Sequence, residues 1–483
     1  MHSLTRIPVA ASVAALLAAC AVGPNYVRPD PHPAPAFAEA EAHLYSAQAL
    51  SPRFWEQFQD PALDALMADA LASNHDLRIA VAHLAEARAV HRLSRFDLVP
   101  TVRASTDYTR EQLPSVEAFG LGGVTESFYD AGFDATWELD LFGRVRRNIE
   151  ASRADLEGAE AGLRDAQVSV TAEVARVYFE LRGQQGELAV ARRNVANEQS
   201  TLDLTNKQLE AGRGTELDTS RAQSQLSSTL GTIDPLEAAI ERSLHRLAVL
   251  TGREPNALHE SLALPRDPPE LPQIVAVSDP AALLRRRPDI RVAERSLAAS
   301  TARVGVAVAD LFPRVTFNGN FGYAAGAPSE LGASGTRTYV IGPSISWAAL
   351  DLGRVRQNIK GAEAHTDAAL AAYEKTVLGA LEEVENALAT HARSRDRLAH
   401  LSDAARASRT AAQIARTRFE GGEASFLEVL DAERTELQAE DALAQTRTET
   451  ATSLVAVYKA LGGGWEGAAL PRAPQSLRLS DRR

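Results

Sequence analysis

Cysteine is almost missing from this chain, since Cys20 is the single one among 483 residues. One thiol cannot form an internal disulfide, so no such cross-link stabilises the fold. Long apolar runs are missing as well, because no segment offers the ~18 consecutive apolar residues of a membrane-spanning helix. Any part that crosses a bilayer must therefore be a closed β-barrel, which also satisfies its own backbone groups in lipid.

The signatures of several enzyme classes are also missing. His259-Glu260 lacks the second histidine of a HExxH zinc site, and neither a GxSxG elbow nor a GxxxxGK[ST] phosphate loop occurs. The sequence therefore predicts a protein that is not an enzyme and has no catalytic, cofactor or metal site. A net charge of -12 argues against nucleic acid as a partner.

What the chain does have begins with an export signal. Arg6, an apolar run over residues 9–17 and small residues before Cys20 predict a secretory signal peptide over residues 1–19. The ending Leu17-Ala18-Ala19-Cys20 resembles a bacterial lipobox, and Ala21 follows instead of the Asp that resembles an inner-membrane retention signal. We expect Cys20 to be acylated and to anchor the chain in the outer membrane, at about 0.8 kcal/mol per buried CH₂. The alternative is a free, buried cysteine.

The two halves of the chain resemble each other at a constant spacing. Trp137, Gly143 and Arg144 recur 210 residues later as Trp347, Gly353 and Arg354. Upstream the spacing is 213, so one connection before Gly143 is three residues longer than its counterpart. We expect a tandem duplication with one repeat over 61–270 and the other over 271–465, between an anchored segment 20–60 and a loose tail 466–483. Several such pseudo-symmetric protomers would close into a ring.

Each half contains a candidate hairpin. Apolar and polar residues alternate without a break over residues 129–141, and this period of two predicts a strand as long as the ~9–11 residues of a tilted membrane strand. Residues 102–108 alternate too, with a loop expected over 111–125. The second half gives strands over 315–323 and 339–347 around a loop at 324–335. A soluble sheet with one wet face is the alternative interpretation.

Four strands per chain are too few for closure, because small closed barrels begin near eight strands. If the strands insert, the protein must oligomerise, since an open edge in lipid leaves backbone groups without partners. Two protomers would supply eight strands and three would supply twelve. Strand arithmetic does not decide between them.

Long helices follow each hairpin, where proline disappears from the sequence. Residues 144–211 are rich in Ala, Leu, Glu and Arg, and one helix through them would be on the order of 100 Å long. We expect turns at Gly212-Arg213-Gly214 and Gly421-Gly422, a returning helix over 217–250, and shorter helices over 61–96 and 280–310. Glycines at 183 and 186 leave a kink open. An ordinary helical bundle would not account for the strands.

Three segments resemble a known family, the TolC and OprM group of trimeric outer-membrane efflux proteins, in its lipid-anchored branch. They are Cys20-Ala21-Val22-Gly23-Pro24-Asn25-Tyr26, the segment WELDLFGR at 137–144 and the segment LLRRRPDIRVAE at 283–294. The resemblance implies a mixed α+β membrane protein: a homotrimer with a twelve-stranded outer-membrane β-barrel continuous with a long periplasmic α-helical barrel. It also implies a passive exit duct for small toxic compounds, coupled through a periplasmic adaptor to an inner-membrane pump of the resistance-nodulation-division type.

The resemblance places a gate just past the two turns. Leu427 matches an apolar constriction, Glu428 and Asp431 match acidic rings, and Asp218 matches an acid of the first half. Carboxylates that converge there would repel each other and gain proton affinity. Ala424 stands where the family has a bridging Arg, so other pairs, through Arg221 or Arg434, would lock the gate. The alternatives are solvated acids and a leucine in the core.

Other interpretations stay open. Trp137 and Trp347 are either aromatic-girdle residues or side chains packed at the strand-to-helix junction. The run Arg285-Arg286-Arg287 is expected to start a helix or to pair with acids rather than to bind phosphate. The same architecture would serve a protein-secretion conduit of type I systems, and a non-conducting lipoprotein scaffold is a third possibility.

Overall fold

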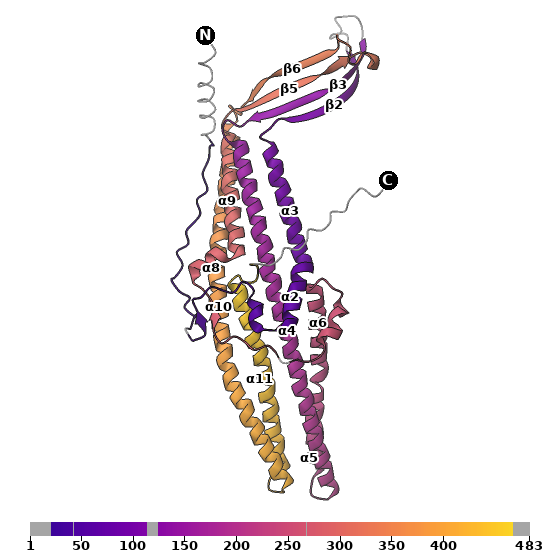
Figure 1. The fold of residues 1–483 in the computed structure, drawn as a ribbon, viewed down its shortest axis with the longest axis vertical. Coiled ribbons are helices and arrows are strands. Elements are labelled where there is room, and N and C mark those ends of the chain that lie inside the picture. The colour runs from indigo at the N-terminus through magenta and orange to yellow at the C-terminus, as the bar shows by residue number, and fades with distance from the viewer. Residues whose placement is uncertain (1–20, 42, 114–123, 267, 467–483) are drawn as a thin grey trace. The chain divides into compact units, whose positions relative to one another are not determined.

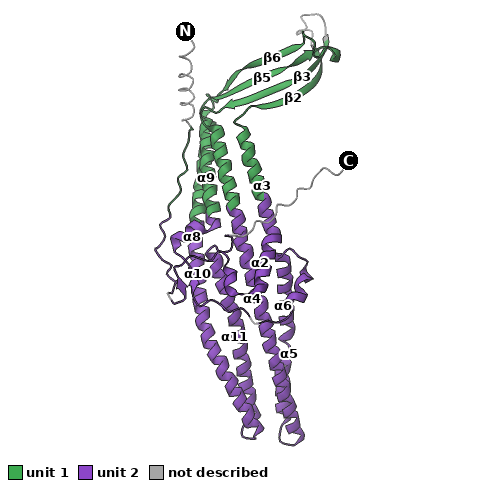
Figure 2. Cartoon of the chain, viewed as in Figure 1, with its two compact units in different colours: residues 1–30, 83–160, 291–375 green, residues 31–82, 161–290, 376–483 purple. Residues whose placement is uncertain are grey.

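The computed structural model describes residues 21–41, 43–113, 124–266 and 268–466 (Figure 1). The chain divides into two compact units (Figure 2). The first comprises the described parts of 1–30, 83–160 and 291–375, and the second those of 31–82, 161–290 and 376–483. Among the described residues, the structure contains no helix with the length and apolar character needed to cross a membrane.

The first unit carries a four-stranded antiparallel sheet. Its strands are β2 (Thr101–Leu113), β3 (Val124–Leu139), β5 (Arg314–Ala325) and β6 (Arg337–Ser346), in the spatial order β2-β3-β5-β6. Phe133 of β3 is in register with Ala104 and Phe321, on the apolar face. On the other face Asp134 accepts hydrogen bonds from Ser105 Oγ at 3.1 Å and Asn320 Nδ2 at 2.8 Å. The predicted two-faced strands are therefore present.

The strands extend further than the sequence predicts. Residues 111–113 and 124–125 belong to β2 and β3, and residues 324–325 belong to β5, although all were expected in loops. At the other end β3 stops at Leu139, two residues early, and Trp347 lies just beyond β6. The remainder of the first expected loop, 114–123, lies outside the described residues.

Two glycines let the halves of the sheet meet. Gly132 of β3 pairs with Gly322 of β5. A Cβ on Gly132 would lie 2.8 Å from the carbonyl oxygen of Phe321, and one on Gly322 would lie 2.7 Å from that of Ala131. Such contacts are closer than real Cβ atoms allow, so this close approach of the two hairpins requires glycine on both strands.

Two very long helices are uninterrupted. They are α4 (Arg144–Glu210) and α10 (Leu352–Glu420), with 67 and 69 residues. The break considered near Gly183 is absent. A Cβ there would lie 2.0 Å from Thr448 Oγ1 of α11 (Phe426–Ala460), so this glycine serves the close packing of α4 on α11.

Three expected helices are each divided in two. The segment 217–250 forms α5 (Glu216–Leu230) and α6 (Ile233–Leu250), because Gly231 weakens the helix and Pro235 lacks an N–H for the carbonyl of Gly231. The segment 61–96 forms α2 (Pro61–Ser73) and α3 (His75–Phe96) around Asn74. The segment 280–310 forms α8 (Pro280–Arg286) and α9 (Pro288–Ala309), because Arg287 precedes a proline and takes an extended conformation.

The second unit holds the largest apolar core. Phe54 and Phe58 of the 3₁₀ helix η1 (Phe54–Phe58) pack on the long helices, and Phe54 stacks on Tyr458 with ring centres 4.8 Å apart. The Tyr178 hydroxyl donates to Asp60 at 2.5 Å. Short elements complete the two units: β1 (Tyr45–Ser46) parallel to β4 (Val275–Ala276), η2 (Pro255–Leu258), α7 (His259–Leu262) and η3 (Pro328–Glu330).

Candidate functional site

Both long helices end in the same kind of turn. After α4, Gly212 adopts a φ of 70° and the Arg213 N–H donates to the Gln208 carbonyl at 2.8 Å. After α10, Gly422 adopts a φ of 79° and the Glu423 N–H donates to the Arg418 carbonyl at 2.8 Å. Glycine accommodates this left-handed conformation at a helix C-terminus without a steric penalty. Both turns lie where the sequence predicts them.

Two of the predicted gate acids cap the returning helices. Asp218 of α5 accepts from the Thr215 N–H at 3.3 Å, and the Thr215 hydroxyl accepts from the Asp218 N–H at 3.3 Å. Glu428 of α11 and Ser425 form the same reciprocal pair at 3.3 and 3.4 Å. Each arrangement is a capping box, which satisfies two otherwise unpaired helix donors. The [ST]-x-x-[DE] spacing that signals a capping box is present in the sequence at both places.

Among the residues that the structure describes, Leu427 and Asp431 take part in no such cap. The Leu427 side chain is 55% exposed, whereas its neighbours Phe426, Val429 and Leu430 are buried in a cluster with Phe419 and Leu202. Leu427 is therefore not a core residue of the single chain. Leu217, at the corresponding position of α5, is 57% exposed. The gate predicted from the sequence does not include this second exposed leucine.

The expected locking arginines do not act within one chain. Asp431, Arg221 and Arg434 are exposed, and none of them makes an ion pair within the parts of the chain that the structure describes. A different carboxylate joins the helices behind the turns. Glu433 is 8% exposed, accepts from Thr201 Oγ1 of α4 at 3.0 Å and pairs with Arg416 of α10.

The first strand-to-helix junction is closely fitted. Asp140 accepts hydrogen bonds from the N–H groups of Val145 and Arg146 at 2.9 and 3.0 Å, so it holds the free N-terminus of α4. Arg144 pairs with Glu138, which raises the pKa of Arg144 even though burial opposes it. Gly143 has a φ of 82°, and a Cβ there would lie 2.6 Å from Ala21 Cα.

The second junction is looser. Gly353 lies in α10 with open space where a Cβ would point. Arg354 pairs with Asp351 at 2.7 Å, with both side chains largely exposed. The tryptophans nevertheless make matching contacts: Trp137 Nε1 donates to the Leu98 carbonyl at 3.0 Å and Trp347 Nε1 to the Leu311 carbonyl at 2.9 Å. Both indoles are thus fixed to the turn that joins the preceding helix, α3 or α9, to their hairpin.

Comparison with known proteins identifies the family of this chain. The model of the outer membrane efflux protein family matches residues 66–253 and again residues 280–463. The chain belongs to this family.

Two curated relatives and one solved structure illustrate the likeness. Outer membrane protein OprJ of Pseudomonas aeruginosa is 34% identical over 466 residues, covering 94% of this chain and 95% of OprJ. The toluene efflux pump outer membrane protein TtgC of Pseudomonas putida is 30% identical over 461 residues, covering 94% and 95%. A structure of the outer-membrane channel OprN superposes with a TM-score of 0.86 at 45% identity, covering 92% of this chain and 100% of that chain.

The efflux function and the outer-membrane location that the sequence predicts are therefore confirmed. In this efflux protein two of the three arginines before Pro288 pair with acids, as expected, whereas the run ends α8 rather than starting a helix. Arg287 is 9% exposed, donates to the Ala460 carbonyl at 2.6 Å and pairs with Asp289 and Glu383 at 2.8 Å. Arg286 pairs with Glu466 at 3.1 Å. These arginines fasten the start of α9 to the end of α11.

Proposed function

We propose that three copies of this efflux protein form a passive exit duct for small toxic compounds. The duct would receive its cargo from an inner-membrane pump of the resistance-nodulation-division type through a periplasmic adaptor. The observation that carries the proposal is the sheet of one chain: four strands, one apolar face, one polar face and two edges, β2 and β6, that pair on one side only within the described residues.

Closure between chains would satisfy those edges. In lipid, each unpaired backbone group costs several kcal/mol, so β2 of one copy would pair with β6 of the next. Exposed apolar side chains support a lipid-facing surface: Phe133 is 58% exposed, Phe321 49% and Ile341 69%. The face with Asp134 would then line an aqueous lumen. The number three and the tandem duplication rest on the family resemblance and on the two successive matches to the family model.

The gate is proposed at Asp218, Leu427, Glu428 and Asp431. Leu427 and Asp431 support it best, because one is an exposed apolar side chain and the other an exposed acid with no ion pair among the described residues, both in the first turns of α11. Asp218 and Glu428 are already engaged in capping boxes. Their replacement would disturb the helix as well as any gate, so variants at Leu427 and Asp431 are cleaner probes.

The test is single-channel conductance of the full-length protein in a planar bilayer. We expect small, mostly closed currents from the wild type and larger open currents from Leu427→Ala with Asp431→Ala. Glu428→Gln keeps the capping box, because a Gln side chain can also accept the hydrogen bond from the Ser425 N–H. This variant therefore removes only the charge. Ser425→Ala is the matched control that weakens the cap and keeps the charge. A folded oligomer without current would refute the duct, and a wide-open wild type would refute the gate.

A lipid anchor on Cys20 fits the position of the residues that follow it, although Cys20 itself and residues 1–19 lie outside the described residues. The Val22 N–H donates to the Phe142 carbonyl at 3.1 Å, and Arg147 donates to the carbonyls of Val22 and Gly23. An acylated Cys20 would therefore lie beside the first strand-to-helix junction. Palmitate labelling of the wild type and its loss in Cys20→Ser would test the anchor.

A further inference from the structure

Helices α10 and α11 are joined by ion pairs seven residues apart. Arg416 of α10 pairs with Glu433 of α11, and Arg409 pairs with Glu440. The two helices are antiparallel, so each step of seven residues down α10 corresponds to seven residues up α11. The next rung at this spacing would consist of Ser402 and Arg447. Arg447 stands where the two preceding rungs have a glutamate, and Ser402 stands where they have an arginine.

The first half of the chain shows what the rung would otherwise contain. The positions 210 residues before Ser402 and Arg447 are Arg192 and Glu237, and these two pair at 2.7 Å. Each half thus has one guanidinium at this rung, on α4 in the first half and on α11 in the second, but only the first half has a carboxylate there. Within the parts of the chain that the structure describes, no carboxylate lies at ion-pairing distance from Arg447.

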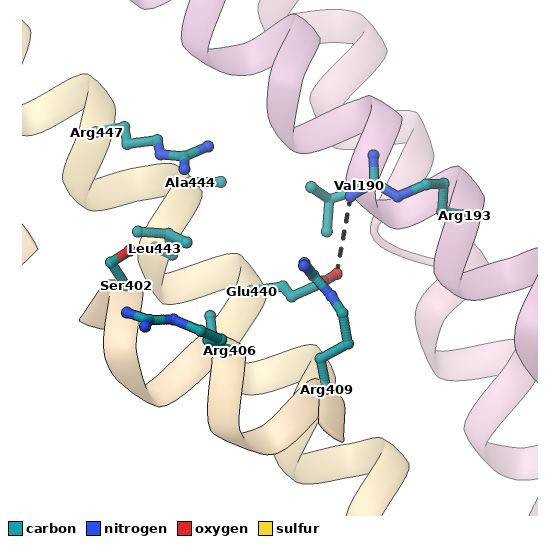
Figure 3. Close-up of a pocket in the computed structure, with 10 residues that line it drawn as sticks. Val190, Arg193, Ser402, Arg406, Arg409, Glu440, Leu443, Ala444 and Arg447 are labelled. Carbon is teal, nitrogen blue, oxygen red and sulfur yellow. Dashed lines mark hydrogen bonds and ion pairs between the residues drawn. The ribbon is translucent and has the colours of Figure 1, made fainter. Parts of the chain in front are cut away.

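A cavity of about 300 Å³ opens at this rung, between α4, α10 and α11 (Figure 3). Its charged lining consists of one acid, Glu440, and four arginines, Arg193, Arg406, Arg409 and Arg447. Glu440 is 6% exposed and lies between Arg409 and Arg193, with Arg193 at 3.9 Å. Arg406 pairs with Asp403, outside the cavity lining. Arg409 also lies 3.8 Å from Glu436, which is likewise outside the lining. Even with Asp403 and Glu436 counted, the four arginines outnumber the three carboxylates.

We propose that this cavity binds a small multivalent oxyanion, of the phosphate or dicarboxylate class, in the place of the missing glutamate. Guanidinium groups are well suited to such ligands, because their planar N–H donors match two oxygens at once. The arginines are exposed, so water and salt screen them, and the affinity is expected on the order of 1 mM. The proposal concerns the helical unit alone and stands whether or not the duct hypothesis holds.

The experiment measures thermal unfolding and titration calorimetry of the full-length oligomer in detergent at pH 7.5. Sodium phosphate and sodium succinate are compared with sodium chloride at equal ionic strength. We expect a saturable rise in the melting temperature with phosphate that chloride does not reproduce. Arg447→Ala should weaken phosphate binding about tenfold, because a hydrogen-bonded charge pair is lost. Arg242→Ala, which removes an exposed arginine of α6 away from the cavity, should leave binding unchanged.

A double variant provides the sharpest control. Ser402→Arg with Arg447→Glu copies the Arg192–Glu237 rung into the second half, so it should fold and should no longer respond to phosphate. A phosphate response that persists in Arg447→Ala would place the anion elsewhere and overturn the proposal. Equal effects of phosphate and chloride on the melting temperature would also overturn the proposal. A folded wild type that responds to neither phosphate nor succinate would also overturn the proposal. Arg447 would then be expected to pair with an acidic side chain of another protein.

Discussion

The two halves of the chain return from their turns differently. The first half returns in two helices, α5 and α6, whereas the second returns in the single 35-residue helix α11. Two positions account for the difference: Gly231 and Pro235 in the first half correspond to Asp441 and Gln445 in the second. A duplicated helical scaffold can therefore differ in shape through two residues while its turns and caps stay alike.

The break has a consequence for the second half. A cavity of about 440 Å³ lies where α5 ends and α6 begins, and it is lined by Gly231 and Pro235 on one side and by Asp441 and Gln445 on the other. Glu187 of α4 also lines it. Gly231 and Pro235, which interrupt the returning helix of the first half, thus face Asp441 and Gln445 of the continuous helix α11. The cavity between them is lined by polar groups of both halves.

The largest expected effect comes from exchanging the helix breaker. Gln445→Pro removes a backbone donor from the interior of α11 and should destabilise the protein by more than about 3 kcal/mol. The reciprocal change, Pro235→Gln, should alter stability by less than about 0.5 kcal/mol, because Pro235 is the third residue of α6, where the N–H has no helical partner. Denaturant unfolding followed by circular dichroism measures both. Equal effects of the two changes would contradict this account of the break.

A second difference lies in the core. His391 is 1% exposed, and its counterpart 210 residues earlier is the buried Leu181. His391 Nδ1 contacts Ser453 Oγ at 3.0 Å, while Nε2 has no hydrogen-bond partner among the described residues. Burial, and then the charge of Arg395, lowers the pKa of His391 to about 4. The imidazole is therefore neutral in the folded protein at neutral pH.

Acid should weaken the second half through this histidine. Because its pKa is lower folded than unfolded, the stability contribution is complete above about pH 6.5 and is lost as the pH falls towards 4. We expect a loss of about 2 kcal/mol over this range. His391→Leu, which copies the first half, should abolish that loss, and the difference in unfolding midpoint between pH 7.5 and pH 4.5 measures it. An unchanged pH dependence in the variant would refute the assignment.

The strands and long helices could be predicted because their signals are local and periodic. The breaks were harder. Asn74 separates α2 from α3 because its amide donates to the Leu250 carbonyl at 2.9 Å, and Leu250 lies 176 residues away in sequence. Gly183 looks like a helix breaker in sequence, yet it is required by Thr448 of α11. Long-range contacts of this kind leave no local pattern.

The candidate site divides in the same way. The family resemblance singles out Asp218 and Glu428, which are 210 residues apart, and the helix-capping pattern around both is present in the sequence. The burial of Glu433 and its contact with Thr201 could not be predicted, because they depend on which face of α4 meets α11. The exposure of Leu427 could not be predicted either, because it depends on which face of α11 its neighbours bury.

The smallest expected effect concerns Glu187, in the cavity opened by the helix break. Burial, and then the nearby charge of Asp441, raises the pKa of Glu187 to about 7, and none of the described residues that line the cavity is a lysine or an arginine. A carboxyl whose pKa is higher folded than unfolded costs stability as the pH rises from about 4.5 to 7. Because the side chain is only partly buried, solvent screening reduces the effect to about 1 kcal/mol.

Glu187→Gln should therefore raise stability by about 1 kcal/mol at pH 8 and leave it nearly unchanged at pH 4.5. Asp441→Asn separates the two causes. Since burial is the larger cause, this variant should keep most of the pH dependence that Glu187 produces. Unfolding midpoints of the three proteins at both pH values decide the matter. If Asp441→Asn removes the dependence as fully as Glu187→Gln does, the charge of α11, rather than the burial of α4 beside the broken helix, controls this carboxyl.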